Sequence, residues 1–149
     1  MRKVFACCLV LAAVVFVVAG CGSKKESEKG DTDQAQTKAT QAACDGSALT
    51  ATTKLPPNFP TVAKATYTKE STEGPTDVTE GFFMGSVEDA HSAYKSALAT
   101  NGYQVTHDEL DEHDSEVNWE GHGRSGQVAI REQCGEGDKV YLHISNRPA

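Results

Sequence analysis

Alternation of apolar and polar residues in the C-terminal half is the feature that most constrains how this chain can fold. Three successive segments carry apolar residues at every second position: Val117 and Trp119, then Val128 and Ile130, then Val140, Leu142 and Ile144. Tyr103 and Val105 begin a fourth segment of this kind. A period of two is the side-chain period of a half-buried β-strand. Polar or glycine-rich turns separate the segments, and connections this short join antiparallel strands.

Two more strands and a helix are predicted upstream. Residues 63–68 alternate, Glu73–Pro75 predicts a turn, and Thr76–Met84 predicts the second strand. Ser86 is a natural helix N-cap, and Asp89 three residues later makes a near match to a capping box. The positions that then recur at helical spacing are Ala90, Ala93, Tyr94, Ala97 and Leu98. Gly102 is suited to the left-handed cap that ends such a helix.

These elements predict an α+β domain of order ββαββββ, with an antiparallel sheet of five to six strands and one helix packed on one face. Alternation assigns ten apolar residues to the covered face: Val78, Phe82, Met84, Val117, Trp119, Val128, Ile130, Val140, Leu142 and Ile144. The opposite face receives Phe83, Arg131, Tyr141 and His143. Aromatic bodies with hydrogen-bonding tips are favoured at recognition surfaces, so these four residues are the candidate binding site. The alternative is an ordinary half-solvated sheet.

The first 21 residues have the layout of a secretory signal. Arg2 and Lys3 precede an apolar run, Val4–Val18, of about 15 residues, which is the length of a signal-peptide core and short for a membrane-spanning helix. Ala19 and Gly20 are small residues of the kind that a signal peptidase requires, and Cys21 follows them at once.

Val18-Ala19-Gly20-Cys21 resembles the lipobox of bacterial lipoproteins. The departure from the family pattern is Val18, where Leu is preferred. The resemblance implies that residues 1–20 are removed as a signal peptide and that the Cys21 thiol receives a diacylglycerol. The new amino terminus in this family is often acylated, for example with palmitate. The protein would then be held at the extracytoplasmic side of the cell membrane by its lipid. The resemblance covers only these residues and implies nothing about the domain behind them.

Residues 22–43 contain no large apolar or aromatic residue. Such a segment cannot bury enough apolar surface to offset the entropy of ordering it. We therefore expect residues 21–43 to form a lipidated, disordered tether and residues 44–149 to form a single domain.

Two of the five cysteines, Cys7 and Cys8, fall in the signal segment, and Cys21 is the lipidation candidate. Cys44 and Cys134 remain, in a compartment that permits disulfides, so we predict that they pair. Losing Arg2 and Lys3 with the signal leaves 12 basic against 21 acidic residues, a net charge of −9. A chain this acidic is repelled by nucleic acid and by anionic lipid head groups.

Residues 107–114 carry two histidines and five carboxylates. Imidazole and carboxylate together suit zinc or a similar divalent ion, and His107, Asp111 and His113, with His122 from the next turn, are the candidate ligands. The spacing matches no recognised zinc or calcium motif, and a solvated acidic turn is the alternative.

No nucleophile motif or paired acid and base points to an enzyme, and no cofactor is expected. The sequence therefore predicts a non-enzymatic, lipid-anchored protein of the cell envelope that binds a protein, peptide or envelope component through its open sheet face. The alternative function is divalent-metal binding by the acidic histidine turn.

Overall fold

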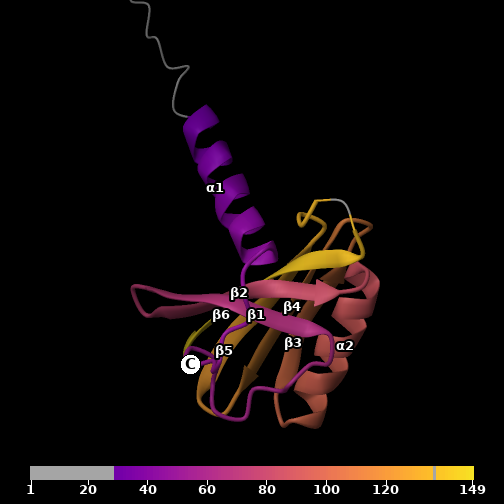
Figure 1. The fold of residues 1–149 in the computed structure, drawn as a ribbon. Coiled ribbons are helices and arrows are strands. Elements are labelled where there is room, and N and C mark those ends of the chain that lie inside the picture. The colour runs from indigo at the N-terminus through magenta and orange to yellow at the C-terminus, as the bar shows by residue number, and fades with distance from the viewer. Residues whose placement is uncertain (1–28, 136) are drawn as a thin grey trace, which may run out of the picture.

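The computed structural model describes residues 29–135 and 137–149. It contains an α+β domain built on one six-stranded antiparallel sheet, with the spatial order β1-β2-β6-β5-β4-β3 (Figure 1). The strands are β1 (Ala65–Glu73), β2 (Thr76–Met84), β3 (Gln104–Leu110), β4 (Asp114–Gly121), β5 (Arg124–Arg131) and β6 (Lys139–Pro148). Two helices accompany them, α1 (Lys29–Cys44) before the sheet and α2 (Val87–Thr100) between β2 and β3. The order ββαββββ is thus present, and the additional helix α1 precedes it.

Helix α2 begins and ends where the sequence indicates. The Ser86 side chain accepts a hydrogen bond from the Asp89 backbone N–H at 3.1 Å, and Asn101 is the C-cap. Gly102 follows with a φ of +81°, a conformation that few residues other than glycine adopt readily. The alanine-rich stripe packs on the sheet, where Ala90, Tyr94 and Leu98 are fully buried.

The face of the sheet beneath α2, here called the α2 face, carries the main core. Its buried members on the strands are Phe83, Val117, Trp119, Val128, Ile130, Val140, Leu142 and Ile144. Leu55, Phe59 and Val62, from the segment that leads into β1, pack against the same core. Val117, Val128 and Ile144 lie opposite one another in successive strand pairs, which confirms the predicted alternation for β4, β5 and β6.

The predicted register of β2 is wrong by one residue. Phe83 pairs with Val140 and is buried in the α2 core, whereas Phe82 pairs with Tyr141 on the opposite face. Val78 and Met84 share the face of Phe82, and Met84 is 48% exposed. Phe82, Phe83 and Met84 are consecutive apolar residues, so alternation alone does not specify which of them faces inward. The pairing of β2 with β6 decides it.

Residues 29–43 are helical, so the prediction of a disordered tether is wrong for this stretch. Figure 1 shows α1 rising away from the sheet, with only its C-terminal end in contact with the domain. That end touches β1, β2 and β6 on the face opposite α2, here called the α1 face. Residues 21–28, the proposed lipobox and the apolar run before it lie outside the described residues. Of the helices that the structure describes, none has the length and apolar character needed to cross a membrane.

Candidate functional site

Three of the four predicted binding residues do share the α1 face. Arg131 on β5 pairs with Tyr141 on β6, and His143 lies two residues further along the same strand. Phe83 is not among them, because its side chain is in the α2 core. Tyr141 is only 5% exposed, since the last turn of α1 packs over it. The four residues therefore do not form an open recognition surface as predicted.

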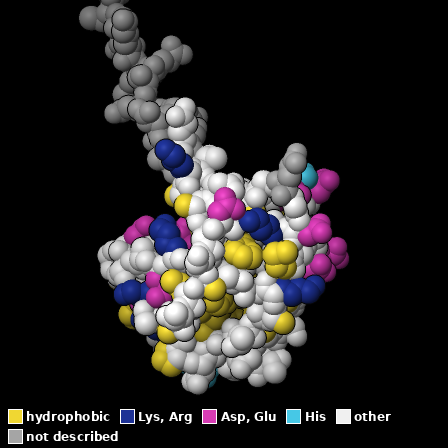
Figure 2. Space-filling view, viewed as in Figure 1, with side chains coloured by type: hydrophobic (Ala, Val, Ile, Leu, Met, Phe, Trp, Pro, Cys, Tyr) yellow, Lys and Arg dark blue, Asp and Glu magenta, His cyan; other side chains and the backbone are white. Residues whose placement is uncertain are grey.

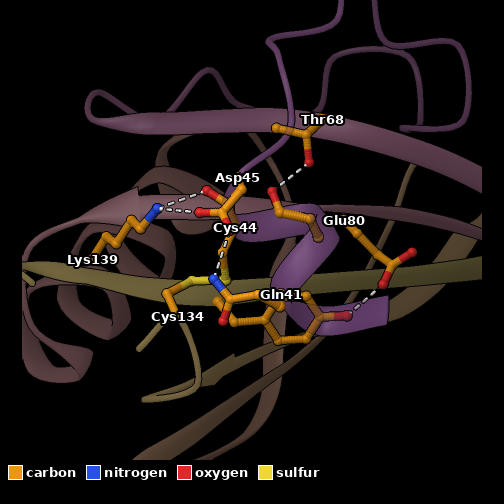
Figure 3. The surroundings of a disulfide bond; sticks show 9 residues. Gln41, Cys44, Asp45, Thr68, Glu80, Cys134 and Lys139 are labelled. Carbon is orange, nitrogen blue, oxygen red and sulfur yellow. Dashed lines mark hydrogen bonds and ion pairs between the residues drawn. A yellow bond between two sulfur atoms is a disulfide. The ribbon is translucent and has the colours of Figure 1, made fainter. Parts of the chain in front are cut away.

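The base of α1 is fastened to this face by a disulfide and by side chains from two strands (Figure 3). Cys44, the last residue of α1, is bonded to Cys134 in the connection between β5 and β6, as predicted. Lys139 of β6 donates to the Cys44 carbonyl at 2.9 Å and forms an ion pair with Asp45 at 3.1 Å. Thr68 of β1 donates from its hydroxyl to the Ala43 carbonyl at 2.7 Å.

A charged group lies beneath the base of α1. The Tyr141 hydroxyl donates to Glu80 Oε1 at 2.6 Å, and Lys69 Nζ forms an ion pair with the other carboxylate oxygen of Glu80. Burial, followed by the hydrogen bond to the Glu80 carboxylate, raises the pKa of Tyr141 well above its usual value. The Tyr141 hydroxyl also interacts with the Thr40 side chain of α1. The buried carboxylate is thus satisfied on both oxygens, and the group joins the helix to the sheet.

His143 lies next to this charged group and forms a hydrogen bond with it. Its Nδ1 lies 3.4 Å from the Tyr141 hydroxyl, and the side chain is partly buried. Burial lowers the pKa of His143 because the charged imidazolium would lose hydration there. This lowered pKa favours the uncharged ring at the margin of α1.

Beyond α1, the same face is open and polar. A groove of about 400 Å³ crosses β6, β5 and β4 at the end of the sheet remote from Cys44. The polar side chains that line it include Asn118, Glu120, Ser125, Gln127, Ser145 and Arg147. Gln127 Nε2 donates to Glu116 at 2.9 Å and to Asn118 at 3.1 Å, which orients the amides in the middle of the groove. We call this set the polar groove.

The surface nearer α1 has a different composition. Figure 2 shows apolar side chains there, lying between basic and acidic ones. Phe82 is partly buried, and Lys139 Nζ lies 5.2 Å from the centroid of its ring. Lys139 is itself held by Asp45 and the Cys44 carbonyl, so its ammonium group is engaged by contacts within the domain.

The structure does not bring the candidate metal ligands together. His107 lies 3.2 Å from Glu109, His113 lies 2.6 Å from Glu132, and His122 contacts the Asn101 carbonyl at 3.0 Å. His113 and His122 flank opposite ends of β4, and Asp111 lies in the turn before that strand. Within residues 29–135 and 137–149, no three His, Cys, Asp or Glu side chains are grouped so that they could hold a metal ion.

Sequence reasoning missed a buried polar pair between α2 and the edge of the sheet. His91 Nδ1 lies 2.6 Å from the Ser115 hydroxyl, and His91 Nε2 lies 3.3 Å from Asp108. The Ser115 hydroxyl donates its proton to the Glu109 carbonyl at 2.8 Å, so His91 Nδ1 must donate to Ser115. Ser115 is 2% exposed and its proton is engaged by a backbone carbonyl, so the trio holds elements together and does not present a nucleophile. The signal was available, because Ser115 is in phase with the buried Val117 and Trp119.

The comparisons with known proteins assign no family to this arrangement. No family model matches the chain, and neither a curated protein nor a solved structure matches it.

Proposed function

We propose that this protein is a non-enzymatic, lipid-anchored component of the cell envelope that binds a protein, peptide or envelope polymer through the polar groove on the α1 face. The anchor is Cys21, at the end of the Val18-Ala19-Gly20-Cys21 sequence. One observation carries the proposal: in the described domain, α2 and the segment before β1 cover one face of the sheet, and much of the other face is open. The open part is lined by amide, hydroxyl, carboxylate and guanidinium groups that can hydrogen-bond to a partner.

This location replaces the site proposed from the sequence. Phe83 and Tyr141 are buried and cannot take part in direct contact. Arg131 and His143 remain partly exposed. His143 lies two residues from Ser145 on β6, whereas Arg131 lies beside Tyr141 at the α1 end of the sheet. A partner that fills the groove would thus approach His143 and not Arg131. The paucity of large apolar side chains among the groove residues favours a partner bound through hydrogen bonds.

The binding site is tested by photo-crosslinking in cells. A photoreactive benzoylphenylalanine at position 127, in the middle of the groove, should give a discrete adduct after irradiation. The matched control places the same residue at Ser92, which is exposed on α2 and faces away from the groove. Adducts identical from both positions, or none from position 127, would contradict the proposed site. A partner identified by mass spectrometry from position 127 should be lost in an Asn118→Ala/Ser145→Ala background.

The anchor is tested separately. The intact mass of the membrane-bound protein should correspond to a chain that begins at Cys21 and carries a diacylglycerol. Cys21→Ser should abolish this adduct and release or mislocalise the protein. A mature chain that begins at another residue and carries no lipid would sink the anchor proposal while leaving the groove proposal standing.

A further inference from the structure

Helix α1 is an unexpected helix, because its sequence is poorly suited to forming one alone. It has 16 residues, contains Gly30 and three threonines, and has no basic residue in its last turn. Gly and Thr are weak helix formers, and isolated helices shorter than about 12–15 residues are marginal in water even when rich in alanine, so α1 is barely above this limit. Figure 1 shows most of α1 projecting from the domain, so packing along its length cannot account for it. The cause must lie at its base.

At the base of α1, the sheet provides hydrogen-bond donors for the last carbonyls of the helix. The last four carbonyls of an α-helix have no intrahelical donors. In α1 the Ala43 carbonyl accepts from the Thr68 hydroxyl and the Cys44 carbonyl accepts from Lys139 Nζ. The Lys139 ammonium also places positive charge at the negative end of the helix dipole. Thr40, Ala43 and Cys44 are buried on the sheet. Strands of the domain therefore cap the helix from outside.

The covalent part of this contact is protected. Cys44 is 1% exposed and Cys134 is 3% exposed. Thiol–disulfide exchange requires a thiolate to reach one of the sulfurs, so burial of both cysteines slows the attack of a reductant while the base stays docked. The folded domain therefore shields the disulfide from reductants.

We propose that the docked base nucleates α1 and makes it a stalk of defined direction, which sets how the domain is presented to whatever the N-terminus is attached to. Nucleation is the costly step of helix formation, and each later residue adds one hydrogen bond. Fixing the last turn on the sheet removes most of that cost, and the helix grows outward from it. At 1.5 Å per residue, α1 is about 24 Å long. That the attached structure is a membrane rests on the proposed function; the stalk itself does not.

The stalk is tested on the full chain in detergent micelles. Hydrogen exchange should show protected amides in residues 34–44, with protection falling toward Lys29 as distance from the base increases. Nitroxides attached through ketone-bearing residues at Lys38 and Glu120, which leave the cysteines untouched, should give a narrow distribution of distances. A broad distribution in the wild-type chain, or exchange in residues 34–44 at the rate of an unfolded peptide, would refute the proposal.

Variants of the base test whether α1 forms because its last turn is docked on the sheet or because its own sequence favours a helix. Thr68→Val with Lys139→Met keeps the disulfide and removes both external caps, and should speed exchange in the last two turns at least tenfold. The matched control is Lys38→Met, which alters an exposed lysine of the same helix and should leave exchange unchanged. Cys44→Ser with Cys134→Ser should abolish protection throughout α1 while the sheet amides of β4 and β5 stay protected. Equal protection of α1 in the wild type and in both base variants would overturn the role of the base.

Liposome flotation distinguishes this inference from the proposed anchor. A chain that fails to float with lipid vesicles but keeps a narrow distance distribution retains the stalk and loses the anchor. A chain that floats but shows a broad distribution retains the anchor and loses the stalk.

Discussion

His91 and Ser115 show how single buried polar side chains position elements in this domain. His91 is 6% exposed on α2 and meets Ser115 of β4 and Asp108 of β3. The three residues join the helix to the edge of the sheet at a point where the apolar stripe does not reach. Hydrogen bonds are directional, so the position of each of these three side chains depends on the positions of the other two.

Ser115→Ala should lower the free energy of unfolding by about 1–3 kcal/mol, because it leaves His91 Nδ1 as a buried donor without a partner. The measurement is urea unfolding followed by circular dichroism. Ser92→Ala, one residue from His91 but exposed, should change stability by less than about 0.5 kcal/mol. Equal effects of the two substitutions would show that the His91–Ser115 contact does not contribute to stability.

Two histidines should give the domain opposing pH dependences between pH 7.5 and 5.5. Burial lowers the pKa of His143, so the unfolded chain binds its proton more readily and stability is lost as pH falls below about 6.5. A hydrogen bond to Glu132 and the nearby Glu112 raise the pKa of His113, so its contribution is present at low pH and is lost as pH rises through the raised pKa. His143→Gln should therefore reduce the fall of the thermal midpoint on acidification, and His113→Gln should enlarge it. Identical pH profiles of both variants and the wild type would contradict these assignments.

Among the elements, the β4–β5 hairpin shows how turn geometry sets register. His122 and Gly123 have φ values of 51° and 75°, and Gly121 pairs with Arg124, so the connection is a two-residue hairpin turn. That register places Gly126 opposite Trp119. Glycine is required at this position, because the indole ring of Trp119 and the backbone of β6 leave no room for a Cβ atom.

Gly126→Ala should destabilise the domain by about 1–3 kcal/mol, the usual cost of overpacking a core. A Cβ at this position would lie 2.3 Å from the Ser145 carbonyl oxygen and 2.5 Å from Cζ2 of Trp119. Thermal unfolding and the near-ultraviolet circular dichroism of Trp119 both report the change. Ser125→Ala, on the opposite face of the same strand, is the control and should leave the Trp119 signal intact. A Gly126→Ala variant with wild-type stability and signal would mean that the hairpin accommodates the methyl group by shifting.

For the whole molecule, the disulfide joins the beginning of the domain to its last third. The sequence separation of Cys44 and Cys134 is 90 residues. Closing a loop of this length restricts the unfolded chain strongly, which favours the folded state. The same bond fastens α1, so one cross-link serves both the stability of the domain and the direction of the stalk.

Replacing both cysteines by serine should lower the free energy of unfolding by up to about 4–5 kcal/mol, the value that the chain-entropy model gives for such a loop. Denaturant titration of the wild type and the variant in the same detergent measures the difference. In the unreduced wild-type protein, denaturation should make neither Cys44 nor Cys134 reactive toward a thiol label. Labelling of both would show that the bond is absent.

The sequence by itself determined the elements that depend on neighbouring residues. Ser86 and Gly102 mark the ends of α2 because capping is local chemistry. Alternation predicts β4, β5 and β6 because one face of each is buried and the other is not. The pairing of Cys44 with Cys134 could be predicted because the other three cysteines lie within the first 21 residues, which we interpret as a signal segment and its lipidation site.

Only the tertiary structure decided what depends on residues distant in the chain. It selected Phe83 over Phe82 for the core, since both are apolar and β6 determines which of them faces inward. It brought His91 to Ser115 and kept His113 apart from His122. It made residues 29–44 a helix although their composition favours disorder, because caps from β1 and β6 satisfy the end of a segment that has little helix-forming tendency of its own. The sequence of residues 29–44 does not reveal these capping residues, because they lie far away in the chain. They stabilise the helix only after the sheet has formed.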